Sequence, residues 1–398
     1  MSCIQCLFGC LTLMGCRDRL TQALVYFPPP VSYAVKEDPN TKTPGMTLIR
    51  RGKLIKSSTY ANQYFHFQHV STKKGTKIPL IHIKYPDADT TIIFSHGNAT
   101  DIGHMRNHFN KLAAELKVAI IAYDYSGYGM AEVDKGATCF EKGRGKPFPA
   151  RTYCDAEAIF DYYELPENKT KKVILYGQSL GSSVTCYLAS TRKVDGFVVH
   201  SGFLSTLRVI VPMENTRWFD VFPNVDRIKQ TSAPCWIIHG QADTDIPIAH
   251  GTGLYEHAPV KYPEPWFVPG GRHNNIEVRY QGEYLTRFKA YLKFIENGEV
   301  AAMEEKKSSS DTLTQGPGAP VPTPPVLLVK VDKTQQDEKE EDVAVAAEVV
   351  HTEQPVKEKE TETETDTTAR DTLIQIDSES TLSSGNENFK TAAETEEV

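Results

Sequence analysis

The chain has 398 residues, of which 24% are charged and 40% are hydrophobic, and its net charge is −7. This length allows one large domain or two ordinary ones. Residues 301–398 contain 23 acidic and 9 basic residues, which leaves 28 acidic and 35 basic residues in the first 300. The first 300 residues thus carry a net charge of +7 and the rest −14, so the net charge of the whole chain is uninformative about its partners. We expect no nucleic acid among these partners.

The segment after residue 298 has the composition of a solvated chain. Among residues 301–398 there is no Cys, Trp or Tyr, and Phe389 is the only aromatic residue. A Pro-rich stretch from Gly316 to Pro325 is followed by an acidic Glu/Thr run from Glu358 to Asp366. Such a segment cannot bury enough apolar surface to offset the entropy lost on ordering. We expect a disordered acidic tail over residues 299–398, in preference to a folded module.

The beginning of the chain holds four of the eight cysteines, at Cys3, Cys6, Cys10 and Cys16. The uncharged stretch from Ser2 to Cys16 is too short to span a bilayer, which takes about 20 apolar residues in a helix. It also lacks the basic residue that precedes the apolar run of a secretory signal. Ser2 excludes N-myristoylation, which needs Gly at that position. We expect residues 1–30 to be a cysteine-rich membrane anchor, S-acylated at these cysteines.

One alternative for this segment remains open. Leu13-Met14-Gly15-Cys16 resembles the lipobox of a bacterial lipoprotein, although the basic residues before it are missing and three cysteines precede the cleavage site. The other four cysteines show no metal or redox spacing and are expected to be reduced thiols that pack as small hydrophobic residues or lie in loops.

Between the anchor and the tail, residues 31–298 alternate short apolar, β-branched runs with helical patterns. The expected strands are Tyr64 to Val70, Leu80 to Tyr85, Thr91 to Ser95, Ala119 to Tyr123, Val173 to Tyr176, Gly196 to His200, Cys235 to His239 and Trp266 to Val268. The expected helices are His104 to Leu116, Tyr153 to Tyr163, Ser182 to Thr191 and Ile276 to Asn297. The first two strands alternate like an antiparallel edge, whereas the later strands are continuous apolar runs, as in strands buried on both faces. The pattern predicts one α/β domain with a mostly parallel eight-stranded sheet, helices on both faces and only a minimal cap.

Ser179 lies in the pentapeptide Gly177-Gln178-Ser179-Leu180-Gly181, after an expected strand and before an expected helix. In this context G-x-S-x-G predicts the nucleophile elbow of the α/β-hydrolase fold. Glycines flank the serine because the turn is tight, and the N-terminus of the following helix favours negative charge. We therefore take Ser179 as the candidate nucleophile, in preference to a chance Gly-Ser turn.

A serine hydroxyl needs a base to take its proton and an acid to orient that base, and in this fold they follow in the order Ser, acid, His. The acid is expected after the strand that ends at His239. There Asp243 is the first choice, because HGxxDxxIP is the frequent form of this loop, and Asp245 is the alternative. The base is expected after the last strand, where His273 is the only strand-end histidine that follows the acid.

An acyl-transfer site also needs N–H donors for the oxyanion. The backbone of Asn98, in the loop after the third strand, and that of Leu180, directly after the nucleophile, are the candidates. His104 and His108 have the i, i+4 spacing of a metal pair, but no third ligand accompanies them. We expect neither a metal nor a cofactor.

Three further strand-end histidines are expected to be buried and hydrogen-bonded instead of catalytic. They are His96, His200 and His239.

Several longer motifs extend beyond these single positions. They are SHGNATDIG at 95–103, YDYSGYG at 123–129, LYGQSLG at 175–181, HGQADTDI at 239–246 and GGRHNNIE at 270–277. Together with the cysteine cluster and LVYFPP at 24–29, they closely resemble the α/β-hydrolase-domain-containing 17 proteins. The resemblance covers the chain up to the acidic tail, and several of these motifs are more specific than G-x-S-x-G.

The resemblance implies a protein depalmitoylase, a thioesterase that removes acyl chains from cysteines of peripheral membrane proteins. It would bind the cytoplasmic leaflet, of the plasma membrane and endosomes, through its acylated N-terminus. The triad roles carry over to Ser179, Asp243 and His273. The chain departs from the family in an apparent insertion at 132–150, in the run 200–203 and in the acidic tail, so the resemblance supports mechanism better than substrate identity.

Two other functions remain open. A lipase or monoacylglycerol esterase would use the same triad on oxygen esters, and apolar residues between Ser201 and Pro234 could line an acyl groove in either enzyme. An inactive membrane scaffold is disfavoured because Ser, Asp and His are all present in the expected order. Unpaired cysteines favour a cytoplasmic location.

Overall fold

The structure is a computed structural model that describes residue 21 and residues 25–37, 44–50, 53–54, 64–133, 147–211 and 213–298. All of them belong to the first of the two units into which the chain divides, Met1–Ala319. The four anchor cysteines, positions 134–146 of the expected insertion and the acidic tail lie outside the described residues.

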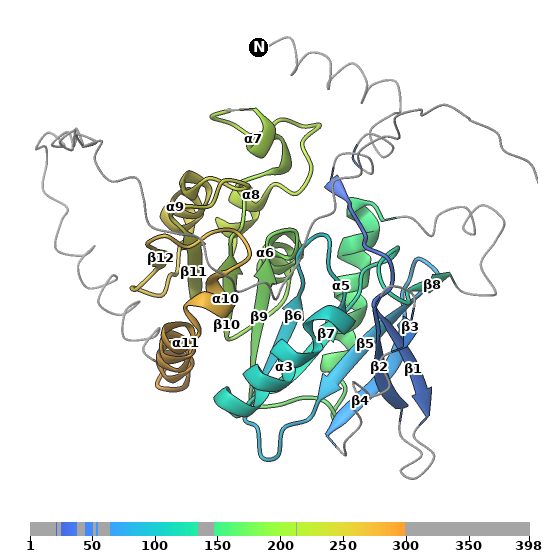
Figure 1. Ribbon diagram of the computed structural model, residues 1–398. Coiled ribbons are helices and arrows are strands. Elements are labelled where there is room, and N and C mark those ends of the chain that lie inside the picture. The colour runs from blue at the N-terminus through green and yellow to red at the C-terminus, as the bar shows by residue number, and fades with distance from the viewer. Residues whose placement is uncertain are drawn as a thin grey trace, which may run out of the picture. The chain divides into compact units, whose positions relative to one another are not determined.

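The main sheet contains nine strands (Figure 1). They are β4 (Phe65–Ser71), β5 (Thr76–Ile83), β6 (Thr90–Ser95), β7 (Ala119–Tyr123), β8 (Glu132–Val133), β9 (Lys172–Gln178), β10 (Gly196–His200), β11 (Cys235–Gly240) and β12 (Trp266–Val268). Their order is β4-β5-β7-β6-β9-β10-β11-β12, with β8 paired to β5. β5 is the one strand of this sheet that runs opposite to all the others, so the mostly parallel α/β-hydrolase sheet and its eight predicted strands are confirmed.

Helices cover both faces of this sheet because its buried strands present apolar side chains to both sides. In β6, Ile92 and Phe94 join the core beneath α3 (Ile102–Leu116) and α11 (Gln281–Glu296), while Ile93 joins the opposite core. That opposite core includes α5 (Pro149–Tyr163), α6 (Gly181–Thr191), α8 (Asn224–Ile228) and α9 (Ile248–His257). The cap is small, as predicted, and consists of α7 (Thr206–Ile210) and α8.

The site's position follows from the strand order. β6 and β9 are neighbours, but β6 leads into α3 on one face and β9 leads into α6 on the other. The two loops therefore diverge and open a crevice at the carboxyl ends of the strands, where ligands bind in such sheets. Ser179 lies at this point.

Several elements differ from the sequence-based expectation, among them the two-residue strand β8, which was not predicted. The helix expected over Ile276 to Asn297 is two helices, α10 (Ile276–Arg279) and α11, because Tyr280 (φ −111°, ψ 29°) leaves the helical conformation. Helix α9 was not predicted, since it contains two glycines. One of them, Gly251, packs so closely on His239 that a Cβ would lie 2.6 Å from the ring Nδ1. A small second sheet, formed by β1 (Tyr33–Glu37), β2 (Pro44–Arg50) and β3 (Lys53–Leu54), was also not predicted.

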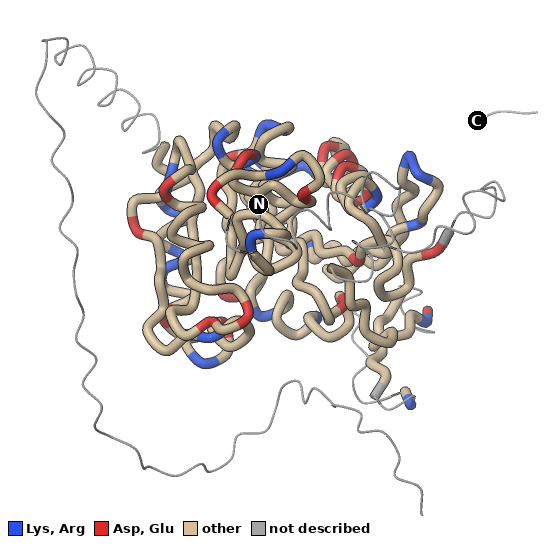
Figure 2. The backbone as a smooth tube through the Cα atoms, turned by 90° about the horizontal axis from the view of Figure 1, so that it is seen from above, with Lys and Arg blue, Asp and Glu red and all other residues tan. Residues whose placement is uncertain are grey.

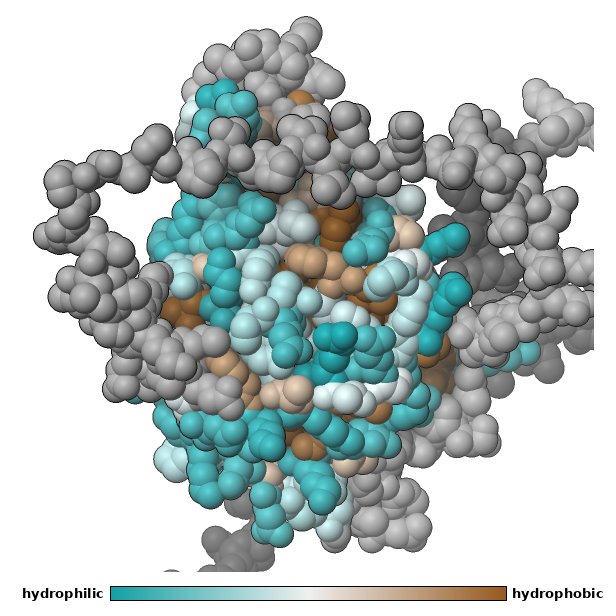
Figure 3. Space-filling model, turned by 90° about the vertical axis from the view of Figure 1, so that its left-hand side faces the viewer, coloured by the Kyte–Doolittle hydropathy of each residue, from teal (hydrophilic) through white to brown (hydrophobic). Residues whose placement is uncertain are grey.

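The surface of the described body is mixed in character. Figure 2 shows basic and acidic positions interspersed along the chain, and Figure 3 shows a mainly hydrophilic face with smaller apolar areas. Among the helices that the structure describes, none is long and apolar enough to cross a membrane. Cys154, Cys186 and Cys235 are buried free thiols, as expected, while Cys139 lies outside the described residues.

Candidate active site

Ser179 occupies a sharp turn between β9, which ends at Gln178, and α6, which begins at Gly181. Its φ of 49° is in the left-handed region, which a non-glycine residue adopts only under strain. The turn is held by hydrogen bonds from the Ser179 N–H to the carbonyl of His200 (2.9 Å) and from the Ser182 N–H to the carbonyl of Ser179 (3.0 Å). A strained serine fixed in this way is what a nucleophile elbow requires.

The two glycines of the pentapeptide are required by close packing of the backbone. A Cβ at Gly177 would collide with the backbone of Gly181, and a Cβ at Gly181 would collide with the carbonyl of Ser95 at the end of β6. Strand β9, helix α6 and strand β6 can therefore approach one another only because both positions lack a side chain.

The structure brings Ser179, His273 and Asp243 together. Nε2 of His273 lies 2.9 Å from Oγ of Ser179, and Nδ1 of His273 lies 2.8 Å from Oδ2 of Asp243. Since Asp243 can only accept when ionised, Nδ1 carries the proton and Nε2 is left to accept the serine hydroxyl proton. The predicted nucleophile, base and first-choice acid thus have the geometry of a catalytic triad.

Asp243 is held as a carboxylate by its surroundings. Burial acts to raise its pKa, but His239, His273 and the N–H of Ile246 oppose it and hold the pKa of this carboxyl well below its usual range. The second oxygen, Oδ1, accepts hydrogen bonds from the N–H groups of Asp245 (3.0 Å) and Ile246 (2.9 Å). The acid is therefore ionised at neutral pH and its orientation is fixed.

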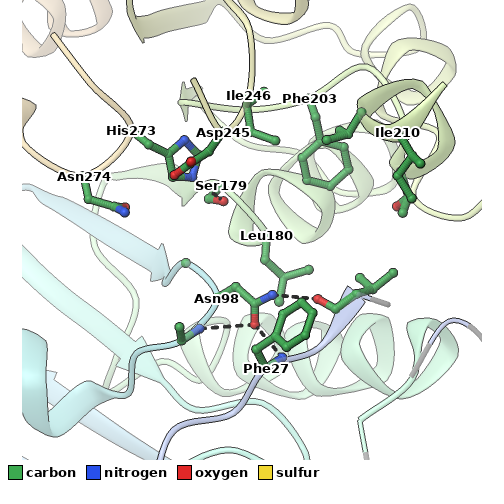
Figure 4. Close-up of a pocket in the computed structure, with 15 residues that line it drawn as sticks. Phe27, Asn98, Ser179, Leu180, Phe203, Ile210, Asp245, Ile246, His273 and Asn274 are labelled. Carbon is green, nitrogen blue, oxygen red and sulfur yellow. Dashed lines mark hydrogen bonds between the residues drawn. The ribbon is translucent and has the colours of Figure 1, made fainter. Parts of the chain in front are cut away.

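Ser179 opens into a cavity of about 420 Å³ with mainly apolar walls (Figure 4). The apolar lining residues come from the N-terminal segment, the loop after β6, the nucleophile elbow, the cap and the acid loop. They are Val25, Phe27, Ala99, Leu180, Phe203, Val209, Ile210 and Ile246. A cavity of this size and lining, next to the nucleophile, is typical of a small-molecule binding site.

The two expected oxyanion donors border the same cavity as Ser179. Leu180 is the N-cap residue of α6, so its N–H belongs to the helix end where backbone donors lack intrahelical partners. The loop that contains Asn98 passes close to the nucleophile, since a Cβ on Gly97 would lie 3.7 Å from Cβ of Ser179. Their role as donors remains a prediction.

Known proteins resemble this chain over most of its length. The α/β hydrolase domain-containing protein 17B of Homo sapiens is 33% identical over 296 residues, which cover 72% of this chain and 94% of that protein. The chain belongs to the α/β-hydrolase-domain-containing 17 family. A further relative, the α/β hydrolase domain-containing protein aho-3 of Caenorhabditis elegans, is 31% identical over 291 residues, which cover 72% of this chain and 81% of that protein. The resemblance inferred from the motifs is confirmed, and the protein is a hydrolase of the α/β type.

No protein-family profile matches the chain. Among solved structures, the Pyrococcus furiosus esterase Pf2001 aligns with a TM-score of 0.48 at 15% identity, covering 68% of this chain and 97% of that one.

In this family member the alternative acid, Asp245, borders the cavity and is exposed. Its carboxylate and the ligand atoms of Asp243 and His273 all lie within 4.8 Å of one another, which is close enough to share a metal ion. However, Nδ1 of His273 donates its hydrogen bond to Oδ2 of Asp243 (2.8 Å). The geometry therefore favours Asp243 as the acid and leaves Asp245 at the cavity rim.

The strand-end histidines that we set aside are buried and hydrogen-bonded. A ring nitrogen of His96 donates to the carbonyl of Gly97 (2.7 Å), and one of His239 donates to the carbonyl of Ile246 (2.8 Å). His200 bonds the hydroxyl of Tyr176 (2.7 Å), and burial lowers its pKa to about 3, so it is neutral.

The spaced pair His104 and His108 does not converge on a common point. Nδ1 of His104 lies 3.1 Å from Oδ1 of Asp101, whereas the ring of His108 packs against the ring of Phe94. The structure therefore gives this pair separate packing and hydrogen-bonding partners.

Sequence reasoning missed the role of the Asn98 side chain. Its Oδ1 accepts hydrogen bonds from the N–H groups of Phe27 (2.9 Å) and Ala99 (3.2 Å) and from the hydroxyl of Tyr128 (2.6 Å), and its Nδ2 donates to the carbonyl of Val25 (2.6 Å). Figure 4 shows the resulting bridge to the segment that carries Phe27. No periodicity or spacing in the sequence relates residue 98 to residues 25–27.

Proposed function

We propose that this protein is a serine thioesterase that removes long acyl chains from S-acylated cysteines of membrane-associated proteins. The observation that carries the proposal is a Ser-His-Asp triad, with bonds of 2.9 and 2.8 Å, at the wall of an apolar cavity of about 420 Å³. Membership of the α/β-hydrolase-domain-containing 17 family supports it. The acylated cysteine cluster at the N-terminus would hold the enzyme on the cytoplasmic leaflet, where its substrates lie.

The reaction proceeds through an acyl-enzyme. Oγ of Ser179 attacks the thioester carbonyl carbon while Nε2 of His273 takes the hydroxyl proton. The oxyanion that forms accepts hydrogen bonds from the backbone N–H groups of Leu180 and Asn98. The C–S bond then breaks, and the departing cysteine sulfur takes the proton from His273. Water next attacks the acyl-serine, with His273 again as the base. The fatty acid leaves and Ser179 regains its proton.

The charge of Asp243 supports this sequence electrostatically. Each time His273 takes a proton it becomes an imidazolium, and the adjacent buried carboxylate stabilises that charge. Hydrogen bonds donated by the backbone N–H groups of Asp245 and Ile246 keep the carboxylate in place without solvent reorganisation.

An assay that compares substrates with the same acyl chain tests the proposal. Purified protein is given a palmitoylated cysteine peptide and, separately, a palmitoyl monoacylglycerol, while a fluorophosphonate probe reports on Ser179. Preferred turnover of the peptide supports a thioesterase. Preferred turnover of the glycerol ester would instead make the protein a lipase, and absence of both turnover and labelling would make it a scaffold.

A further inference from the structure

The 2.9 Å contact between Ser179 and His273 joins loops that follow two non-adjacent strands of the sheet. Ser179 follows β9 and His273 follows β12, and the two strands are separated by β10 and β11. Ladder hydrogen bonds fix each strand only to its neighbours. The relative position of nucleophile and base therefore depends on contacts between their loops as well as on the sheet.

A buried side-chain hydrogen bond makes such a contact. Nε2 of Gln178 donates to Oε1 of Glu277 over 2.8 Å. Gln178 directly precedes the nucleophile, and Glu277 lies four residues after His273, in α10. The exposed fractions of the two residues are 7% and 8%, so the bond is shielded from water. A longer contact, from the Ser201 hydroxyl to the carbonyl of His273 at 3.4 Å, supports the same loop.

The pair also contacts the other parts of the site. Oε1 of Gln178 would lie 3.9 Å from a Cβ on Gly97, in the loop of the expected oxyanion donor. Oε1 of Glu277 lies 3.7 Å from Nδ1 of His200, whose carbonyl holds the Ser179 N–H. The pair thus lies at the junction of the elbow, the oxyanion loop and the base loop.

We propose that Gln178 and Glu277 are positioning residues that hold His273 at hydrogen-bonding distance from Ser179. The inference rests on the proposed function, because it assigns these residues to the alignment of that triad. In a dry environment their bond is strong, and loss of one partner leaves the other buried without a partner. The base loop would then shift, and a displacement of about 1 Å at a catalytic group can cost about 100-fold in rate.

Four variants of the full chain test this pair, each assayed for kcat and KM and for the second-order rate at which a fluorophosphonate labels Ser179. Glu277→Ala removes the acceptor, while Glu277→Gln keeps an acceptor oxygen. Gln178→Glu places two carboxyl groups together, and the double variant Gln178→Glu with Glu277→Gln restores an amide–carboxyl pair with exchanged positions. Rates are normalised to the serine that is labelled at completion.

A matched control removes a carboxylate at the opposite end of β9. Asp195 accepts the N–H of Val173 over 2.8 Å, far along the strand from Gln178. Asp195→Ala should lower the melting temperature and leave the labelling rate unchanged. It therefore separates loss of stability from loss of alignment.

We expect Glu277→Ala and Gln178→Glu to lower kcat and the labelling rate about 10- to 100-fold, with KM changed less than about threefold. Glu277→Gln should stay within about threefold of the wild type, and the double variant should recover most of the loss of Gln178→Glu. Wild-type labelling in all variants, or a double variant no faster than Gln178→Glu, would overturn the inference. The second criterion applies even if Glu277→Ala fails to fold. Absence of Ser179 labelling in the wild type would instead refute the proposed function.

Discussion

The backbone N–H of Phe27 donates a 2.9 Å hydrogen bond to the side chain of Asn98, and this bond makes the N-terminal segment a wall of the cavity. Between Val25 and Phe27, the side chain of Tyr26 is buried and bonds the hydroxyl of Thr152 over 2.8 Å. The expected anchor, residues 1–30, therefore ends in a segment that packs on the hydrolase body and lines the same cavity as the nucleophile. The cavity wall that starts at Val25 thus begins nine positions after Cys16, the last of the proposed acylation sites.

This arrangement predicts that Phe27 contributes to selection of the acyl chain. Phe27→Ala should raise KM about fivefold for a palmitoyl thioester, since its ring is half exposed and provides about 1 kcal/mol of apolar contact. An acetyl thioester, too short to reach the ring, should be turned over as before. Val31→Ala is the control, because Val31 is also exposed in the same segment but does not line the cavity. Equal effects on both chain lengths would contradict the prediction.

The triad predicts a strongly non-additive loss of activity. Ser179→Ala and His273→Ala should each reduce kcat by several orders of magnitude, and the double variant should lose little more, because the residues act as a unit. Circular dichroism and melting temperature should show an intact fold, since Ser179 lies in an open cavity and His273 is only partly buried. Turnover at the wild-type rate by a clean Ser179→Ala preparation would refute the nucleophile.

The two acids are distinguished by their partners. Asp243→Asn should lower kcat about 10⁴-fold, because an amide at this position stabilises the wrong tautomer of His273. Asp245→Asn should have a far smaller effect, since Asp245 lies at the exposed rim. Steady-state kinetics of both variants show which acid orients His273. A larger loss of kcat in Asp245→Asn than in Asp243→Asn would assign that role to Asp245.

The sequence predicted those parts of the fold and site that local pattern specifies. Eight apolar strands and the elbow could be identified because alternation, strand length and the flanking glycines of Ser179 are local signals. The loop carrying His273 could be placed because chain order is fixed in this fold. The Gln178–Glu277 bond and the Asn98 bridge join residues 99 and 71 positions apart, respectively. Such contacts depend on the packing of non-adjacent segments, which one sequence does not encode as a pattern.

A buried carboxyl predicts one component of the pH dependence of stability. Asp155 accepts hydrogen bonds from the N–H (2.7 Å) and hydroxyl (2.9 Å) of Ser126, and burial raises its pKa from 3.8 to about 7. Between these values the folded state keeps a proton that the unfolded state has lost. Its stabilising contribution is therefore full below pH 4 and is lost as the pH rises through 7.

The variant Asp155→Asn cannot ionise, so it isolates this component. Relative to Asp155→Asn, the wild type should lose unfolding free energy from pH 4 to pH 7, by at most about 1.4 kcal/mol per pH unit. Buried histidines such as His82, whose pKa burial lowers to about 3, act in the opposite direction but equally in both proteins. Urea unfolding at several pH values measures the difference, and parallel curves would show that Asp155 is ionised in the folded protein.

The last prediction concerns the four N-terminal cysteines, which lie outside the described residues. One acyl chain gives only marginal, reversible membrane binding, so stable anchoring takes two signals. A variant with Ser at Cys3, Cys6, Cys10 and Cys16 should therefore move to the soluble fraction, one that keeps a single cysteine should partition between fractions, and one that keeps two should remain on the membrane.

In the same series of variants, activity on membrane-bound substrates should separate from activity on soluble substrates. Hydrolysis of acylated membrane proteins should fall with membrane binding, whereas turnover of a soluble thioester should stay constant, because every variant retains Val25 and Phe27 against Asn98. Membrane fractionation and both assays on the same preparations provide the test. If the four-cysteine variant stays on the membrane, the anchor is not acylation of this cluster. If soluble turnover also falls, residues before Val25 contribute to the cavity, because the segment that Asn98 holds would then need the anchor to keep its position.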